Sequence, residues 1–301
     1  MKTLAPSTVT TRDPKGLKFV SIIEAAYNKA GLSEEEAQCV NDTPGLSERV
    51  TGFIADNRAS NKFKNEEVAS NYGYLSDYKA PKPIHEQVKI IHQLFRNVSW
   101  GLFRNVSWGY FRPDERTVAV PSGAEGLFAI PKWQTIAPTY SEAIQKVLDA
   151  IKKVRYGKFV NYRDGQINEQ RLRQTAKTKT AFDMLGDEQK DHDILVVSAQ
   201  FGIRHRGRSV RRAREVFSQN EFGLGAFAVG IMILTHAKRF QHYDDLWIDC
   251  AGDEFDDPYA GVRFAQAPYF GWHGGAAMFN ADGFSYAYES CGSASAFVPQ
   301  N

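Results

Sequence analysis

The sequence predicts an α+β fold: an N-terminal helical segment, then a mixed α/β core with a C-terminal antiparallel β-meander. Three observations predict this class. Capped stretches with helical apolar spacing fill residues 17–70. An apolar, β-branched run at 194–199 is typical of a strand that is covered on both faces. From Val262 onward, aromatic residues alternate with glycine turns, as in a series of hairpins.

Local patterns also predict the domain organisation. Residues 1–16 are polar and are expected to form a disordered tail, and residues 17–70 a small helical unit. Residues 71–83 combine glycine and proline with tyrosine, which predicts a linker without regular structure. Residues 84–301 are expected to form one mixed α/β domain, a size that suits a single core.

The elements follow from periodicity and capping signals. Gly31 ends the first helix, and Ser33 with Glu36 forms a capping-box pattern for the second. Helices are expected at 21–30, 47–57, 84–95, 141–154, 167–185, 209–217 and 222–236, with a short one after Ser33. Strands are expected at 118–120, 127–130, 158–162, 194–199 and 246–250, ahead of the meander.

One octad is duplicated in tandem. Residues 94–101 (Leu-Phe-Arg-Asn-Val-Ser-Trp-Gly) recur at 102–109. An eight-residue period keeps strand facing unchanged but rotates a helix face by about 80°. A pair of strands or a loop therefore accommodates the repeat more easily than a helix does. Two copies are too few for a solenoid, and we assign the duplication no function.

The sharpest chemical feature is an arginine-rich segment, Arg204–Arg214, which holds six arginines and no acidic residue. It lies where the predicted strand at 194–199 gives way to a helix that Ser209 caps. Strand-to-helix junctions commonly bind anions. The candidate anion-binding or phosphate-binding residues are Arg204, Arg206, Arg208, Ser209, Arg211 and Arg212.

The helix dipole gives a second reason to expect an anion at the arginine-rich segment. The N-terminus of a helix is electropositive and favours acids, yet here it carries arginines. An anion nearby is needed to stabilise them, and the guanidinium fork favours phosphate or carboxylate. Three anions fit: an external phosphate, a nucleic-acid backbone, or the protein's own carboxylates. For the last, seven acids gather within the fourteen residues from Asp244 to Asp257.

Some of those acids also suggest a metal site. Asp249, Asp253 and Glu254 follow the strand predicted at 246–250, a usual place for carboxylates that hold a divalent cation. Turn formation, or pairing with the arginines, is the simpler reading of the same residues. The cofactor is left unknown, and a divalent metal is one that these residues allow.

Two weaker patterns have ordinary explanations. Gly223, Gly225 and Ala228 match the spacing of a dinucleotide fingerprint, but the residues before them look polar and helical, so close helix packing is favoured. Cys291 lies among small residues and could act as a nucleophile with His273 or His242 as its base. A buried structural cysteine is the favoured interpretation.

Composition limits the classes of protein. Net charge is +2, so any binding of nucleic acid must be local. Three scattered cysteines without a CxxC pair argue against a zinc knuckle or a disulfide scaffold. The N-terminus lacks an apolar signal core, and the longest apolar stretch, 224–234, is too short to span a bilayer. A cytoplasmic protein without membrane association is expected.

The chain resembles a family of bacterial proteins known mainly from environmental genomes. The resemblance rests on HRGRSVRRARE from His205, EFGLGAFAVGIMILTH, DDLWIDCAGDEF and the ending GSASAFVPQ. It covers most of the chain except the duplicated octad. The resemblance implies no activity and no site residues.

The leading functional hypothesis is an anion-binding protein whose partner is nucleic acid or a phosphate-bearing ligand. The first alternative is a metal-assisted phosphoester hydrolase that uses the carboxylates at 249–254, with the arginines holding the phosphate. The second is a structural, self-assembling protein without enzymatic activity. The sequence leaves the oligomeric state, including a homo-oligomer, open.

Overall fold

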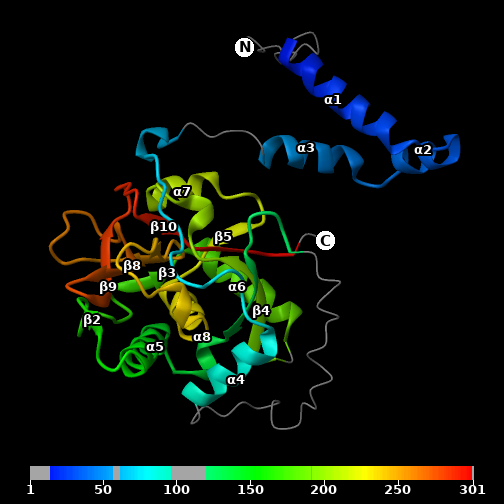
Figure 1. Ribbon diagram of the computed structural model, residues 1–301. Helices are drawn as coiled ribbons and strands as arrows, with labels where there is room; N and C mark the ends of the chain where they lie inside the picture. The colour runs from blue at the N-terminus through cyan, green and yellow to red at the C-terminus, as the bar shows by residue number, and fades with distance from the viewer. Residues whose placement is uncertain (1–13, 57–61, 96–119, 191, 300–301) are drawn as a thin grey trace, which may run out of the picture. The chain divides into compact units, whose positions relative to one another are not determined.

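The computed structural model describes residues 14–56, 62–95, 120–190 and 192–299. It divides into two compact units, 1–58 and 59–301 (Figure 1). Most of the duplicated octad, the predicted tail up to residue 13, and residues 118 and 119 of a predicted strand lie outside the described residues. The boundary between the units falls at 58/59, ahead of the segment 71–83 in which the sequence placed a linker.

The N-terminal unit consists of helices α1 (Pro14–Ala30), α2 (Glu34–Asn41) and α3 (Leu46–Asp56). Helix α1 begins at Pro14, inside the segment expected to be a tail, because proline is well suited to the first turn of a helix. It ends before Gly31, whose φ is +61°. The predicted capping box is confirmed: Ser33 Oγ accepts the Glu36 amide at 3.3 Å, and Glu36 accepts the Ser33 amide at 2.9 Å.

The second unit contains two sheets. The first is antiparallel, in the order β1 (Gly126–Pro131), β4 (Ile194–Gln200), β11 (Ser295–Phe297) and β5 (Glu221–Gly223). The strands predicted at 127–130 and 194–199 are therefore confirmed. Strand β11, near the end of the chain, lies between β4 and β5 and joins the C-terminal segment to the middle of the unit.

The second sheet is mixed. Its main path runs β10 (Cys291–Ser293), β6 (Trp247–Asp249), β8 (Gln266–His273), β7 (Asp253–Phe255) and β3 (Leu172–Gln174). Strand β9 (Ala276–Gly283) pairs with β8 and, in parallel, with β2 (Phe159–Asn161). Strands β8 and β9 form the predicted hairpin. Its two-residue turn, Gly274-Gly275, has φ of +59° and +80°, as a type I′ turn requires.

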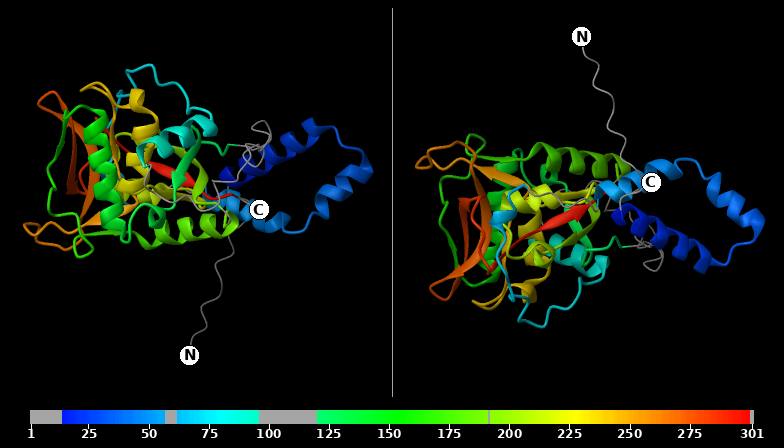
Figure 2. Two further views of the ribbon diagram at one scale, coloured as in Figure 1. Left: turned by 90° about the horizontal axis from the view of Figure 1, so that it is seen from below. Right: turned by 90° about the horizontal axis from the view of Figure 1, so that it is seen from above.

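Helix α8 (Ala226–Thr235) is the centre of the core, and each of its residues is buried. It packs against α5 (Tyr140–Val154), α4 (Ile84–Leu94) and β1. A β-carbon at Gly230 would collide with Val147 of α5, so glycine lets the two helices approach closely. Figure 2 shows α5 in green at the side of this unit where the orange and red strands stand.

Helices α6 (Ala176–Glu188) and α7 (Val210–Val216), with 3₁₀ turns η1 (Lys64–Glu66), η2 (Trp133–Thr135), η3 (Ile203–His205) and η4 (Ala237–Arg239), complete the unit. Two predicted helices were wrong in extent. The segment 167–185 contains β3 before α6, which Thr175 caps by accepting the Thr178 amide. The segment 222–236 contains β5 before α8, because Gly225 is an extended N-cap. No described helix is both long and apolar enough to cross a bilayer.

Candidate functional site

The arginine-rich segment occupies the predicted strand-to-helix junction. It leaves β4 through η3 and enters α7, whose N-cap is Ser209. Ser209 Oγ accepts the amide of Arg212 at 3.1 Å, which confirms the predicted cap. Ser209 and Arg212 are both buried. The local structure expected from the sequence is therefore present.

The carboxylates of Glu66 and Glu67, here called the glutamate clamp, lie at the N-terminus of α7. Ser209 Oγ donates to Glu66 at 2.6 Å, and Arg211 Nε contacts both Glu66 oxygens at 2.7 and 2.8 Å. Arg212 Nε donates to Glu67, and Arg208 Nε lies 3.5 Å from the same carboxylate. The anion that the helix dipole favours is thus supplied by the chain itself.

The remaining arginines also contact acceptors within the chain. Arg204 Nε donates to Glu221 at 3.2 Å, and Arg206 Nη1 donates to the carbonyl of Tyr72 at 2.8 Å. Arg214 donates to the carbonyls of Ala251 and Asp253, each at 2.8 Å. Internal pairing is present, but its carboxylates are Glu66, Glu67 and Glu221 rather than the acids at 244–257. Glu66 lies 143 residues before Ser209, so no local pattern in the sequence indicated this pairing.

These ion pairs alter the titration of the glutamates. The guanidinium of Arg211, together with the Ser209 hydroxyl, holds the pKa of Glu66 below its usual value. Burial acts against ionisation of Glu221, but hydrogen bonds from His205 and Ser295 and the charge of Arg204 bring its pKa to about 2. Both carboxylates therefore remain ionised partners of the arginines well below neutral pH.

The three candidate metal ligands do not converge. Asp253 accepts the Tyr140 hydroxyl at 2.9 Å and the Ala226 amide at 2.7 Å, while Glu254 accepts Arg173 Nε at 2.8 Å. Asp249 lies on another strand and lines a separate pocket. Across the described ranges, no three His, Cys, Asp or Glu side chains gather closely enough to hold a metal ion.

The glycine pattern at Gly223 and Gly225 does stand between a strand and a helix, because β5 precedes α8. The expectation of a helical segment there is corrected. However, the carboxylate of Asp253 occupies the N-terminus of α8, and a β-carbon at Gly225 would collide with it. Gly223 in turn packs against the Ala251 backbone. The glycines permit close backbone packing, as the sequence favoured.

A pocket of about 310 Å³ lies on one face of the mixed sheet, and we call it the Asp249 pocket. Trp247 and Asp249 are two residues apart on β6, so both side chains point to this face. Tyr269 on β8 lies directly opposite Asp249, and its ring stacks on Trp247 with centroids 6.0 Å apart. Asp282 on β9 completes the group from the sheet.

The two carboxyl groups in this pocket have different environments. Asp282 accepts the Tyr288 hydroxyl at 3.1 Å and the Gly283 amide at 2.7 Å. Asp249 receives no side-chain hydrogen bond from any described residue. Burial, reinforced by the negative charge of Asp282, raises the pKa of Asp249 to about 7. Asp249 therefore changes protonation state near neutral pH.

The outer wall of the pocket comes from the segment after β9 and from α7. Tyr286 and Tyr288 lie beside each other with ring centroids 6.3 Å apart, and Val210 of α7 faces the same space. A β-carbon at Gly283 would collide with the Tyr286 ring, so glycine lets this ring fold over the strand end. Four aromatic rings thus surround two carboxyl groups.

The arginine-rich segment braces this wall. The Gly207 amide donates to the Cys291 carbonyl at 2.9 Å, and Arg206 forms a β-bridge with Gly292. The Arg211 amide donates to the carbonyl of Phe284 at 3.0 Å. Figure 1 shows α7 beside β10, in line with these contacts. The glutamate clamp therefore holds the helix that contributes Val210 to the pocket lining.

Cys291 lines the pocket, but it is not an activated nucleophile. Burial, together with the charge of Asp249, raises the pKa of its thiol well above the usual value. The ring of His273 meets Tyr162 edge to face, and the backbone amide of His242 donates to Asp245. A structural role for Cys291 agrees with the interpretation that the sequence favoured.

The comparisons with known proteins add no functional assignment: no family model, curated protein or solved structure matches this chain. The chemistry of the Asp249 pocket is therefore argued from its own residues.

Proposed function

We propose that this protein binds a small organic cation, of the substituted-ammonium type, in the Asp249 pocket. The observation that carries the proposal is the composition of its lining. Two carboxyl groups and four aromatic rings face one cavity of about 310 Å³, and none of the described residues that line it is basic. Such a surface complements a positive charge with an apolar periphery.

Each component of the pocket acts on a different part of such a ligand. The ring faces of tyrosine and tryptophan attract an organic cation by about 0.5–2 kcal/mol each. Asp282 offers a carboxylate held by Tyr288 and the Gly283 amide. The Asp249 carboxyl group, which accepts no hydrogen bond from a described residue, gains an ionic partner when the cation enters. Its negative charge is then stabilised by the ligand.

The contacts of the arginine-rich segment indicate a structural role for it, which leaves the Asp249 pocket as the better candidate for ligand binding. Its six guanidinium groups already contact carboxylates or carbonyls of the chain. A phosphate at α7 would have to displace the glutamate clamp. Phosphate or nucleic-acid binding by Arg208 and Arg212 is therefore less well supported than binding of a cation next to Asp249.

Calorimetric titration with choline and its uncharged carbon isostere, in which a tert-butyl group replaces trimethylammonium, tests the proposal. The two probes share shape and differ in charge. Choline is expected to bind at least about tenfold more tightly, which corresponds to about 1.4 kcal/mol. Equal affinities, or binding of neither probe at millimolar concentration, would contradict cation recognition.

A further inference from the structure

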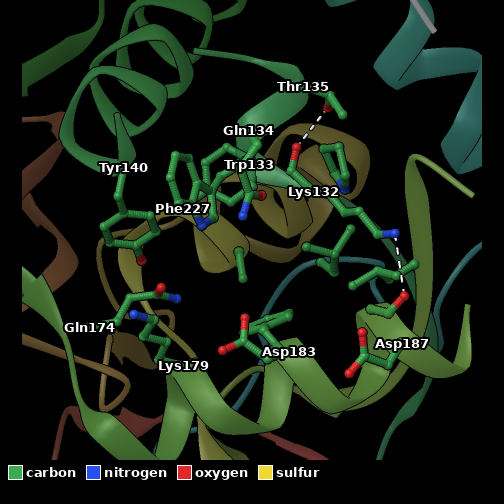
Figure 3. Close-up of a pocket in the computed structure, with 16 residues that line it drawn as sticks. Lys132, Trp133, Gln134, Thr135, Tyr140, Gln174, Lys179, Asp183, Asp187 and Phe227 are labelled. Carbon is green, nitrogen blue, oxygen red and sulfur yellow. Dashed lines mark hydrogen bonds between the residues drawn. The ribbon is translucent and has the colours of Figure 1, made fainter. Parts of the chain in front are cut away.

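A second hollow, larger than the Asp249 pocket, lies on another part of the α/β unit and belongs to none of the features above. Its volume is about 530 Å³, and it is bordered by η2, the start of α5, α6 and the first turn of α8 (Figure 3). A cavity of this size is in the range that holds small organic ligands. We call it the α6 cleft.

The interior of the α6 cleft is apolar and aromatic. Ile130 and Leu195 contribute from β1 and β4, and Phe227 from α8. The rings of Trp133 and Tyr140 meet edge to face with centroids 6.0 Å apart. The centroid of the Tyr140 ring also lies 6.4 Å from that of Phe227. This part of the cleft favours a ring or a branched alkyl group.

The side of the cleft at Tyr140 is held by a hydrogen-bond network that includes the buried Asp253. The Tyr140 hydroxyl donates to Asp253, which also accepts the first amide of α8 from Ala226. Burial, together with the charge of Asp253, raises the pKa of Tyr140 well above its usual value, so the phenol stays protonated. Because Tyr140 already donates its hydroxyl hydrogen to Asp253, none is left for a ligand.

The rim, in contrast, carries a basic and an acidic side chain that form no ion pair with other described residues. Lys179 and Asp183 lie one turn apart on α6. Within the part of the chain that the structure describes, neither forms an ion pair or a side-chain hydrogen bond. Figure 3 shows the Lys179 ammonium beside the Gln174 amide, and the Asp183 carboxylate directed into the cleft, opposite Trp133 and Phe227.

From this arrangement we propose that the α6 cleft binds an α-amino acid with an aromatic or branched aliphatic side chain. Its carboxylate contacts Lys179 and Gln174, and its ammonium group contacts Asp183. Side chains four residues apart on a helix have β-carbons about 5–6 Å apart. Neighbouring ammonium and carboxylate groups of one ligand can therefore meet both, while the ligand's side chain enters the apolar interior.

Three related probes test each contact separately by calorimetry: L-phenylalanine, N-acetyl-L-phenylalanine, which lacks the ammonium group, and phenethylamine, which lacks the carboxylate. Asp183→Asn is expected to weaken L-phenylalanine binding about tenfold and to leave N-acetyl-L-phenylalanine unchanged. Lys179→Met is expected to weaken L-phenylalanine about tenfold and to leave phenethylamine unchanged. Lys152→Met, on the exposed face of α5, is the matched control and should change nothing.

Both variants and the control are made in chains that also carry Asp249→Asn, so that phenethylamine has no second carboxylate pair to bind. Failure of choline to bind the unaltered chain would then count against the Asp249 pocket alone. The amino-acid proposal is overturned if L-phenylalanine does not bind at millimolar concentration. It is equally overturned if either substitution weakens all three probes to the same extent in a variant that melts at the temperature of the control, since the substituted group would then recognise neither the ammonium nor the carboxylate of the ligand.

Discussion

Replacing Asp249 and Asp282 together with asparagine is expected to weaken choline binding by at least a hundredfold. Two ionic contacts to a partly desolvated cation contribute on the order of 1.5 kcal/mol each, so their combined loss comes to about 3 kcal/mol, a little more than the about 2.7 kcal/mol of a hundredfold change. The four aromatic rings remain, so the double variant should still prefer choline to its uncharged isostere, but by a smaller factor than the parent. Titration calorimetry of both ligands gives this comparison directly.

The controls for this prediction separate charge from folding. Asp149→Asn removes one carboxylate from the exposed face of α5, outside the pocket, and should leave choline affinity unchanged. The double variant should melt no earlier than the parent, because close like charges are removed from a partly buried site. Choline binding as tight in the folded double variant as in the parent would rule out recognition by these carboxylates.

Replacing Glu66 with alanine is expected to destabilise the α/β unit by about 3 kcal/mol. The change leaves the buried Ser209 hydroxyl without its acceptor and Arg211 without its carboxylate. Breaking a buried ion pair from one side costs about 3–5 kcal/mol, and we take the lower end because Arg211 is 36% exposed. The loss of the anion at the N-terminus of α7 acts in the same direction.

Urea unfolding monitored by circular dichroism measures this effect. Glu188→Ala, at the exposed end of α6, is the control and should lower the free energy of unfolding by less than about 0.5 kcal/mol.

The lowered pKa of Glu66 also determines how the free energy that this residue contributes to folding depends on pH. Its contribution is fully present above the pKa of an unfolded glutamate, about 4.3, and is lost as pH falls through the lower folded value. A Glu66→Ala chain as stable as its parent would show that the clamp does not hold α7.

The fold was largely predictable where a signal is local. The Ser33 capping box, the cap at Ser209 and the Gly274-Gly275 hairpin each depend on residues close in sequence. The predicted helices were wrong in extent where a short strand precedes a helix. Strands β3 and β5 have three residues each, too few for a periodic pattern, and their helical neighbours mask them.

The candidate site was predictable only in part. The sequence singled out the arginine-rich segment and required an anion at α7, but the glutamate clamp lies about 140 residues earlier and only tertiary structure brings it there. The sequence grouped Asp249 with Asp253 and Glu254, but the structure places it in a different set of neighbours. Its partners in the pocket, Tyr269 and Asp282, come from strands paired through long-range register, which no local spacing encodes.

Proton release on cation binding is the most direct test of the central claim. The pKa of Asp249 is raised to about 7. A cation beside this carboxyl group favours its ionised form, so binding at pH 7 should expel about half a proton per choline bound. Calorimetry in two buffers of different ionisation enthalpy measures that number. A release near half a proton, absent in Asp249→Asn, is the result we predict; choline binding without any proton release would contradict the account.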